Sequence, residues 1–209
     1  MNLFITYLWK DPRLFFTVAV VVVLSISIHE FMHACTALKC GDDTAARNGH
    51  LTLNPFKQMG PFSLLLFCLF GLAWGSVPVD PRKMRGRYAP ALTAFAGPAA
   101  NIVLSLFFII LTYVCFKKHI GDEFAVDMLF YASTLNVVLF FLNMLPVPGF
   151  DGFAILGTLF PRFLQNSSEA VRGTVFLLVM LLFVFFDQLF RLARIVTSSE
   201  LLVLEWIFG

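Results

Sequence analysis

Five apolar runs dominate the chain, and they constrain its fold more than any other feature. The three longest cover Leu14 to Leu38, Ala89 to Phe116 and Phe124 to Leu145, and about 20 apolar residues are enough for a helix that crosses a bilayer. Only 13% of the 209 residues are charged, against about a quarter in soluble domains. Because backbone polar groups in lipid must be bonded within the protein, the sequence predicts an all-α polytopic membrane protein.

The two other runs differ in length and interruption. Phe62 to Val77 is short and contains Gly71 and Gly75, which favours an element that enters the membrane and returns on the same side. Val171 to Phe190 is long enough to cross. The tail, Leu201 to Phe208, is too short to cross and is expected at the membrane interface or against the bundle. We therefore expect a bundle of about four full transmembrane helices plus a re-entrant apolar element.

A polar stretch separates the first two runs. His50-Leu51-Thr52-Leu53 alternates polar and apolar residues between turn signals, so a short strand and loop region is expected after the first helix. The chain has no low-complexity linker. We expect residues 1–209 to form a single transmembrane domain, with a core at about 14–160 and a C-terminal span and tail at 171–209.

The first run contains the motif His29-Glu30-Phe31-Met32-His33. On a helix, HExxH places two imidazoles one turn apart on the same face, as a zinc ion needs, and puts a carboxylate beside them that can take a proton from zinc-bound water. The structural alternative is a helix with incidental polar residues. Burying three ionisable groups in lipid is costly, so the motif indicates a metal site.

A third metal ligand is expected where the helix of the Phe124 run breaks. Two prolines and two glycines follow Asn143, and Asp151 lies within this break. Irregular backbone at membrane depth is tolerated only where it is buried in protein or lines a wet cavity. A catalytic zinc site usually has three protein ligands, and Asp151 is the best-placed carboxylate. The alternative is that Asp151 simply caps the next helix.

The sequence Gly97-Pro98-Ala99-Ala100-Asn101 lies in an otherwise apolar span. Its small residues allow helices to approach closely, and the amide of Asn101 must find partners in lipid. Asn101 therefore either joins two helices or helps to hold substrate.

These three motifs, in this order, resemble those of the site-2 protease family of intramembrane zinc metalloproteases. The resemblance covers roughly residues 25 to 157. The stretches Asn136 to Pro146 and Gly49 to Pro55 are similar to small bacterial-type members. Departures are Phe153, where many members have glycine after the Asp-Gly pair, and Gln58-Met59-Gly60-Pro61, where relatives often have His-x-Asp-Pro. No PDZ-like insertion is present.

The resemblance implies peptide-bond hydrolysis in or near the bilayer. It implies one Zn²⁺ per chain held by His29, His33 and Asp151, with Glu30 as the catalytic base. Asn143 and Asn101 are candidate donors to the oxyanion, with structural hydrogen bonding as the alternative for each. His50 is a weaker auxiliary candidate, for which the favoured interpretation is a capped residue of the short strand. The expected partners are transmembrane protein substrates and the lipid bilayer. No basic cluster interleaved with aromatic residues suggests nucleic acid.

The topology follows from the chemistry. His33 and Asp151 can share one zinc only if the ends of their two spans lie on the same side, which requires the Phe62 run to be re-entrant. Nine of the 15 Lys and Arg residues then lie on that side, which favours a cytoplasmic orientation in a bacterial-type cell membrane. The active site is therefore expected toward the cytoplasmic side.

Two other classes of protein also place His and Asp in membrane spans. A metal transporter usually shows inverted repeats and polar groups at several depths, and this sequence shows neither. A non-proteolytic metal-binding membrane protein stays the alternative of the same class, and the intact HExxH and Asp151 argue against a catalytically inactive relative that binds membrane partners.

Overall fold

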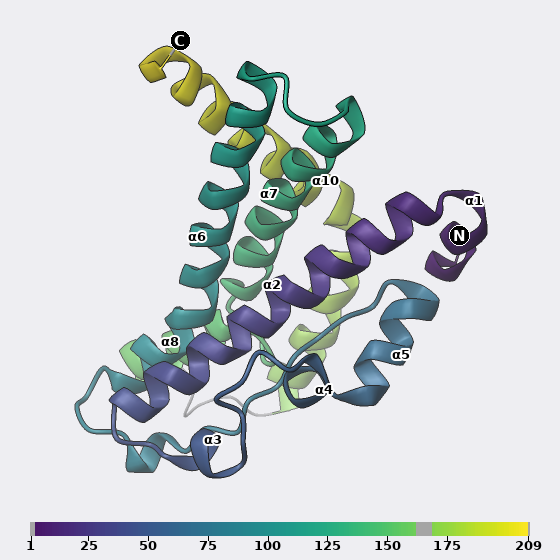
Figure 1. Ribbon diagram of the computed structural model, residues 1–209. Helices are drawn as coiled ribbons and strands as arrows, with labels where there is room; N and C mark the ends of the chain where they lie inside the picture. Colours follow the sequence, from purple (N-terminus) through teal and green to yellow (C-terminus); the bar gives the residue numbers. More distant parts are fainter. Residues whose placement is uncertain (1–2, 162–168, 209) are drawn as a thin grey trace. The chain divides into compact units, whose positions relative to one another are not determined.

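The computed structural model describes residues 3–161 and 169–208, and it is helical without any strand over these two stretches (Figure 1). The chain forms two compact units, Met1–Ala100 and Asn101–Gly209. The expectation of a single domain stays a prediction. In chain order the helices are η1 (Phe4–Thr6), α1 (Tyr7–Lys10), α2 (Pro12–Lys39), α3 (Thr44–Arg47), α4 (Pro55–Gln58), α5 (Gly60–Phe70), η2 (Pro81–Lys83), α6 (Ala89–Lys117), α7 (Glu123–Asn143), α8 (Asp151–Leu159) and α10 (Glu169–Phe208).

Three helices, α2, α6 and α7, are long and apolar enough to cross a membrane. They correspond to the three longest apolar runs, so the chain is an α-helical membrane protein as expected. The fourth expected span lies on α10, whose side chains before Gln188 fall outside the description, and it stays a prediction. The apolar tail is not a separate element, because α10 continues through it to Phe208.

The first unit turns apolar side chains outward and keeps polar ones inside. On α2, the side chains of Phe16, Val20 and Leu24 are 57%, 56% and 48% exposed. They recur every four residues and so form one stripe along the helix. Ser25 and Ser27 are each only 1% exposed. A large exposed apolar stripe is unfavourable in water, whereas facing lipid it is the expected surface of a spanning helix.

Local signals set the ends of α2. The carboxylate of Asp11 accepts a hydrogen bond from the N–H of Leu14 at 3.0 Å, and Pro12 occupies the first helical position. Both features are favoured at a helix start. The helix ends before Gly41, whose φ of 101° suits glycine.

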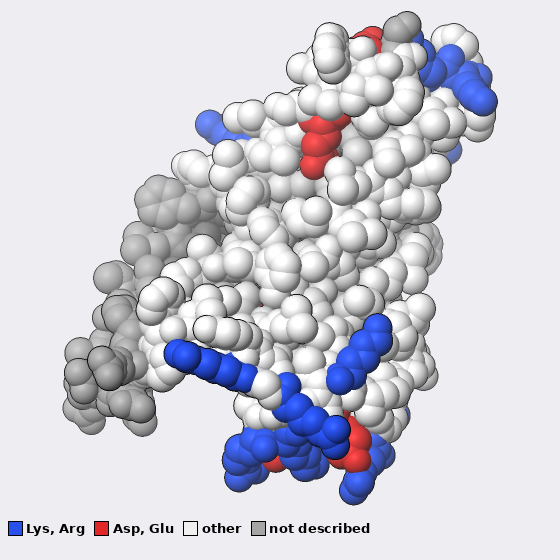
Figure 2. Space-filling view, turned by 90° about the vertical axis from the view of Figure 1, so that its left-hand side faces the viewer, with Lys and Arg blue, Asp and Glu red and all other residues white. Residues whose placement is uncertain are grey.

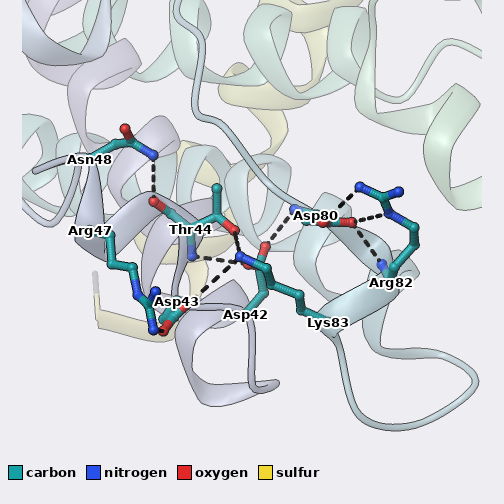
Figure 3. A network of polar contacts seen from close by, with 8 residues as sticks. All are labelled: Asp42, Asp43, Thr44, Arg47, Asn48, Asp80, Arg82 and Lys83. Carbon is teal, nitrogen blue, oxygen red and sulfur yellow. Dashed lines mark hydrogen bonds and ion pairs between the residues drawn. The ribbon is translucent and has the colours of Figure 1, made fainter.

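A polar clasp joins the end of α2 to the segment before α6 (Figure 3). The fully buried carboxylate of Asp42 accepts hydrogen bonds from the N–H groups of Thr44 at 3.0 Å and Asp80 at 2.6 Å. Nearby, the N–H of Arg85 donates to the carbonyl of Cys40 at 2.7 Å. Burial of Asp42 opposes ionisation, but the hydrogen bonds from Thr44 and Asp80 outweigh it and hold the pKa of this carboxyl below its usual range.

The segment between the two sides of the clasp contains helix α5 and, after it, residues 72–80, which run back toward α2 without regular secondary structure. We call residues 72–80 the extended return. Helix α5 has 11 residues and ends at Gly71, which adopts a left-handed φ of 79°. The expected apolar run to Val77 is therefore helical only to Phe70, and residues 72–80 form no helix or strand. The hydroxyl of Ser63 joins α5 to the extended return, because it donates to the carbonyl of Trp74 at 2.7 Å and accepts from the N–H of Trp74 at 3.0 Å.

The strand expected at His50 to Leu53 is wrong. The side chain of Gln58 takes the place of a partner strand, because its amide donates to the carbonyls of His50 at 2.9 Å and Thr52 at 2.5 Å. The backbone carbonyl of Gln58 also accepts from the N–H of Ser76 at 2.9 Å. One buried glutamine therefore orders the loop and anchors the extended return to it.

In the second unit, polar pairs join α6 to α7. The amide of Asn101 donates to Oδ1 of Asn136 at 3.1 Å, and the hydroxyls of Ser105 and Ser133 lie 2.9 Å apart. All four side chains have no measurable exposure. Helix α10 packs on α7 through a small apolar cluster around Val137, Val138 and Ala193.

Candidate metal centre and active site

The two histidines of the HExxH motif lie side by side in the interior of the first unit. His29 and His33 are 6% and 8% exposed, and their Nε2 atoms are 3.0 Å apart. Two nitrogens bound to one tetrahedral zinc ion would lie about 3.3 Å apart. The pair therefore needs only a small adjustment to hold one metal ion.

A backbone carbonyl fixes the orientation of His33. The Nδ1 atom of its ring lies 2.7 Å from the carbonyl oxygen of Thr93 on α6. A carbonyl can only accept a hydrogen bond, so Nδ1 must carry the proton. In the neutral imidazole the lone pair is then on Nε2, which faces His29. This is the arrangement by which a second group usually orients a metal-binding histidine.

Gly97 provides the space in which the two imidazoles sit. A Cβ atom at this position would fall 2.5 Å from Nε2 of His29 and would also overlap Nε2 of His33. No side chain larger than hydrogen fits against the rings here. The glycine that the sequence suggested for close helix approach therefore faces the histidines directly.

Glu30 lies beneath the extended return. It is 8% exposed, and a Cβ atom at Gly75 would fall 2.6 Å from its carboxyl carbon. The backbone at Gly75 is thus in contact with the carboxylate. Glu30 therefore follows His29 on α2 and lies against a stretch of extended backbone.

Asp151 and Asn143 lie in the second unit. Asp151 is the first residue of α8 and is partly buried, while the capping position is Phe150 and makes no side-chain cap. The following residue, Gly152, lies against the carbonyl of Met144, where a Cβ atom would overlap it. The amide of Asn143 donates to the carbonyl of Leu139 at 3.0 Å, one turn back in α7.

The two other candidates have structural contacts. The hydrogen bond from Asn101 to Asn136 joins α6 to α7, as one of the two interpretations of this residue expected. His50 lies in the loop, where its Nδ1 atom is 3.4 Å from Oε1 of Gln58. Any direct part that either residue takes in catalysis stays a prediction.

Two residues of the site have no clear signal in the sequence. Thr93 contributes only its backbone carbonyl, which any residue could supply. Gly75 was noticeable only as an interruption of an apolar run. Both contact the HExxH helix across more than 40 positions of sequence, so only the fold could bring them to the site.

We expect the substitution Gly97→Ala to weaken metal binding by about tenfold or more, because the added methyl group must displace the two rings and such overpacking costs roughly 1–3 kcal/mol. Alanine favours a helix over glycine by about 1 kcal/mol, so helix propensity would act in the opposite direction. Zinc affinity of the purified protein measures the effect.

Val103→Ile is a matched control, since it adds one carbon to the same helix at a side chain that is 65% exposed. Its zinc affinity should equal that of the parent. Equal affinity in the Gly97→Ala protein would show that the rings are not confined as described.

Comparison with known proteins places the chain in a family. It is 33% identical over 172 residues to "Putative zinc metalloprotease YwhC" of Bacillus subtilis, which covers 79% of this chain and 78% of that protein. It is 30% and 33% identical to proteins named "Putative zinc metalloprotease Rip2" of Mycolicibacterium smegmatis and Mycobacterium tuberculosis, and spans 64% of the length of each. No protein-family model and no solved structure matches the chain. With this identity over most of both chains, and with the three motifs in order, the chain belongs to the site-2 protease family.

Proposed function

We propose that the chain is an intramembrane zinc endopeptidase that hydrolyses peptide bonds in or near the transmembrane segments of membrane proteins. The observation that carries this proposal is the buried pair of Nε2 atoms 3.0 Å apart, with the tautomer of His33 fixed by Thr93 and with Glu30 alongside. The names of the relatives support zinc and proteolysis.

The metal would be held by His29, His33 and Asp151. The two histidines fit it, because both are buried, their Nε2 atoms lie 3.0 Å apart, and Nε2 of His33 carries the lone pair that a metal ion needs. Asp151 is supported by its place in the Asp-Gly motif and by the capping position of α8, which is occupied by Phe150. A bound zinc ion supplies an activated water at neutral pH and polarises the scissile carbonyl.

Glu30 is the proposed general base. It directly follows His29 in the HExxH motif and is not one of the proposed ligands, so we assign it to take a proton from the attacking water and later deliver it to the leaving amine. Its burial, at 8% exposure, keeps bulk water from competing for that proton. A neutral donor should face the developing oxyanion, and Asn143 and Asn101 remain the candidates.

The extended return offers a surface for the substrate backbone. Within the part of the chain that the structure describes, the backbone N–H and carbonyl groups of Ala73 and Gly75 have no hydrogen-bond partner. A substrate helix must be unwound locally before its backbone can be cleaved. We propose that the unwound stretch pairs with residues 72–77, as an added strand does, and so lies across Glu30.

The segment from α5 to the extended return is proposed to be re-entrant, with the active site toward the cytoplasmic side. Its two ends meet in the hydrogen bond between Arg85 and Cys40 and in the clasp of Asp42 with Asp80. A segment that crossed the bilayer would separate its ends by about 30 Å. The excess of Lys and Arg on this side supports the orientation.

Glu30→Gln should abolish cleavage of a model transmembrane peptide, by about 100-fold or more, while zinc content stays near one per chain. The amide keeps the shape of the side chain but cannot take the proton. Cleavage at the parental rate would rule out the proposed mechanism. Zinc binding with no cleavage by the parental protein would instead favour a non-proteolytic metal-binding protein.

Asp151→Ala should lower zinc content well below one per chain, because it removes one of three proposed ligands. Asp122→Ala is the control, since Asp122 caps α7 by accepting from the N–H of Ala125 at 2.9 Å. The control should cost roughly 0.5–2 kcal/mol of stability and leave zinc content unchanged. Full zinc occupancy in the Asp151→Ala protein would exclude Asp151 from the ligand set.

The re-entrant arrangement predicts that Asn48 and Arg87, both exposed, lie on one face of the membrane. Single cysteines at these positions, in a protein lacking the four native cysteines, should react with an impermeant thiol reagent from the same side. A cysteine at Lys118, beyond α6, should react from the other side. Labelling of positions 48 and 87 from opposite sides would contradict the proposed topology.

A further inference from the structure

The segment from the end of α2 to the start of α6 has an excess of positive charge that the fold does not neutralise. Residues 39–88 contain seven Lys and Arg side chains and three aspartates, which leaves an excess of four positive charges. Figure 2 shows basic side chains gathered with a few acidic ones at the lower end of this face, next to a broad surface with few charged side chains.

Each of the three aspartates is already occupied (Figure 3). Asp42 accepts from two backbone N–H groups. Asp43 pairs with Arg47 at 2.6 Å and with Lys83 at 3.7 Å. Asp80 pairs with Arg82 at 2.9 Å. No carboxylate in this region is left to neutralise the remaining cations.

The four remaining cations form a set that we name the basic collar: Lys39, Lys57, Arg85 and Arg87. All four are exposed, and none makes an ion pair with a carboxylate among the described residues. The stem of Arg85 lies over Gly41, where a Cβ atom would fall 3.2 Å from its Cγ atom. The clasp around Asp42 fixes the backbone that carries Arg85, so part of the collar is already ordered.

Exposed apolar side chains flank the collar. Phe56 precedes Lys57 and is 67% exposed, and Tyr88 follows Arg87 and is 58% exposed. Leu53 is 50% exposed and lies just before α4, the short helix that carries Lys57. Side chains of this kind insert at the boundary between headgroups and acyl chains, while neighbouring Lys and Arg reach the phosphates.

We propose that the basic collar binds the headgroups of anionic phospholipids. The charge excess matches a phosphate-rich surface, and a guanidinium can bind phosphate oxygens in pairs. The flanking apolar groups favour lipid over a soluble acidic partner, because lipid offers both phosphate and hydrocarbon within a few ångströms. The bound lipids would hold the loops that carry the extended return at a fixed depth in the membrane. This proposal does not depend on proteolysis.

The test uses the full chain with the substitution Glu30→Gln, reconstituted in phosphatidylcholine vesicles containing a trace of spin-labelled lipid. Electron spin resonance then gives the preference of the protein for labelled phosphatidylglycerol over labelled phosphatidylcholine. The double substitution Lys57→Gln and Arg87→Gln should lower this preference by about fivefold for each charge removed at low salt, and by less at physiological salt.

Two controls make the outcome specific. Lys117→Gln with Lys118→Gln removes the same charge after α6 and should leave the preference near that of the parent. The double substitution Lys57→Arg and Arg87→Lys keeps the charge and should retain the preference for phosphatidylglycerol. An unchanged preference in the double glutamine variant, or an equal loss in the Lys117 and Lys118 variant, would overturn the proposal. So would binding of a soluble polyanion by a protein with no lipid preference.

Discussion

The structure depends on keeping a few polar groups away from lipid on a helix that is otherwise apolar. His29, Glu30 and His33 lie on α2 between side chains such as Phe16 and Leu24 that face outward. An ionisable group in hydrocarbon costs several kcal/mol, so other parts of the chain must cover these three. Backbone provides part of this cover, because Gly75 contacts Glu30 and Gly97 faces the two histidines.

The extended return can cover Glu30 only because its ends are fixed. Ser63 is hydrogen-bonded to Trp74, and the carbonyl of Gln58 accepts from the N–H of Ser76. Gly75 lies between these two residues, so its position is fixed from both neighbours. The clasp of Asp42 with Asp80 then brings the chain back to the end of α2. These contacts come from polar side chains that satisfy backbone groups, a role that a partner strand would otherwise fill.

The sequence predicted the spanning helices well, because length and hydropathy decide whether a segment crosses a membrane. The runs of Leu14 to Leu38 and Ala89 to Phe116 lie within α2 and α6. It predicted less well where a backbone group has a partner distant in sequence. The expected strand at His50 is a loop because Gln58 bonds its carbonyls, and the Phe62 run stops being helical at Gly71. The tail proved continuous with α10, since no residue there breaks the helix.

In the candidate site, too, the sequence predicts the local features better than the contacts between residues that are distant in sequence. HExxH gives the histidine pair directly, because the spacing of four residues is a local property of a helix. The contacts that orient the pair are not local. The carbonyl of Thr93 and the backbone of Gly75 reach α2 from two other segments, and the sequence does not tell which distant group a backbone carbonyl or a glycine will meet. Asp151 is predictable as a ligand only through its motif, since an aspartate at a helix start is also a common cap.

The Gly-Pro-x-x-Asn sequence of α6 combines three requirements on one helix face. Thr93 and Gly97 are four residues apart and therefore lie one above the other, so the same face orients His33 and leaves room for both rings. Pro98 has no N–H, so the carbonyl of Ala94 receives no hydrogen bond from it and the helix is locally less constrained beside Thr93. One turn after Gly97, Asn101 bonds Asn136 and fixes the rotation of α6 against α7. A rotation of the first turns of α6 about the helix axis would remove both the carbonyl that orients His33 and the clearance for the two rings, which explains why a glycine occurs one turn after Thr93 in an apolar span.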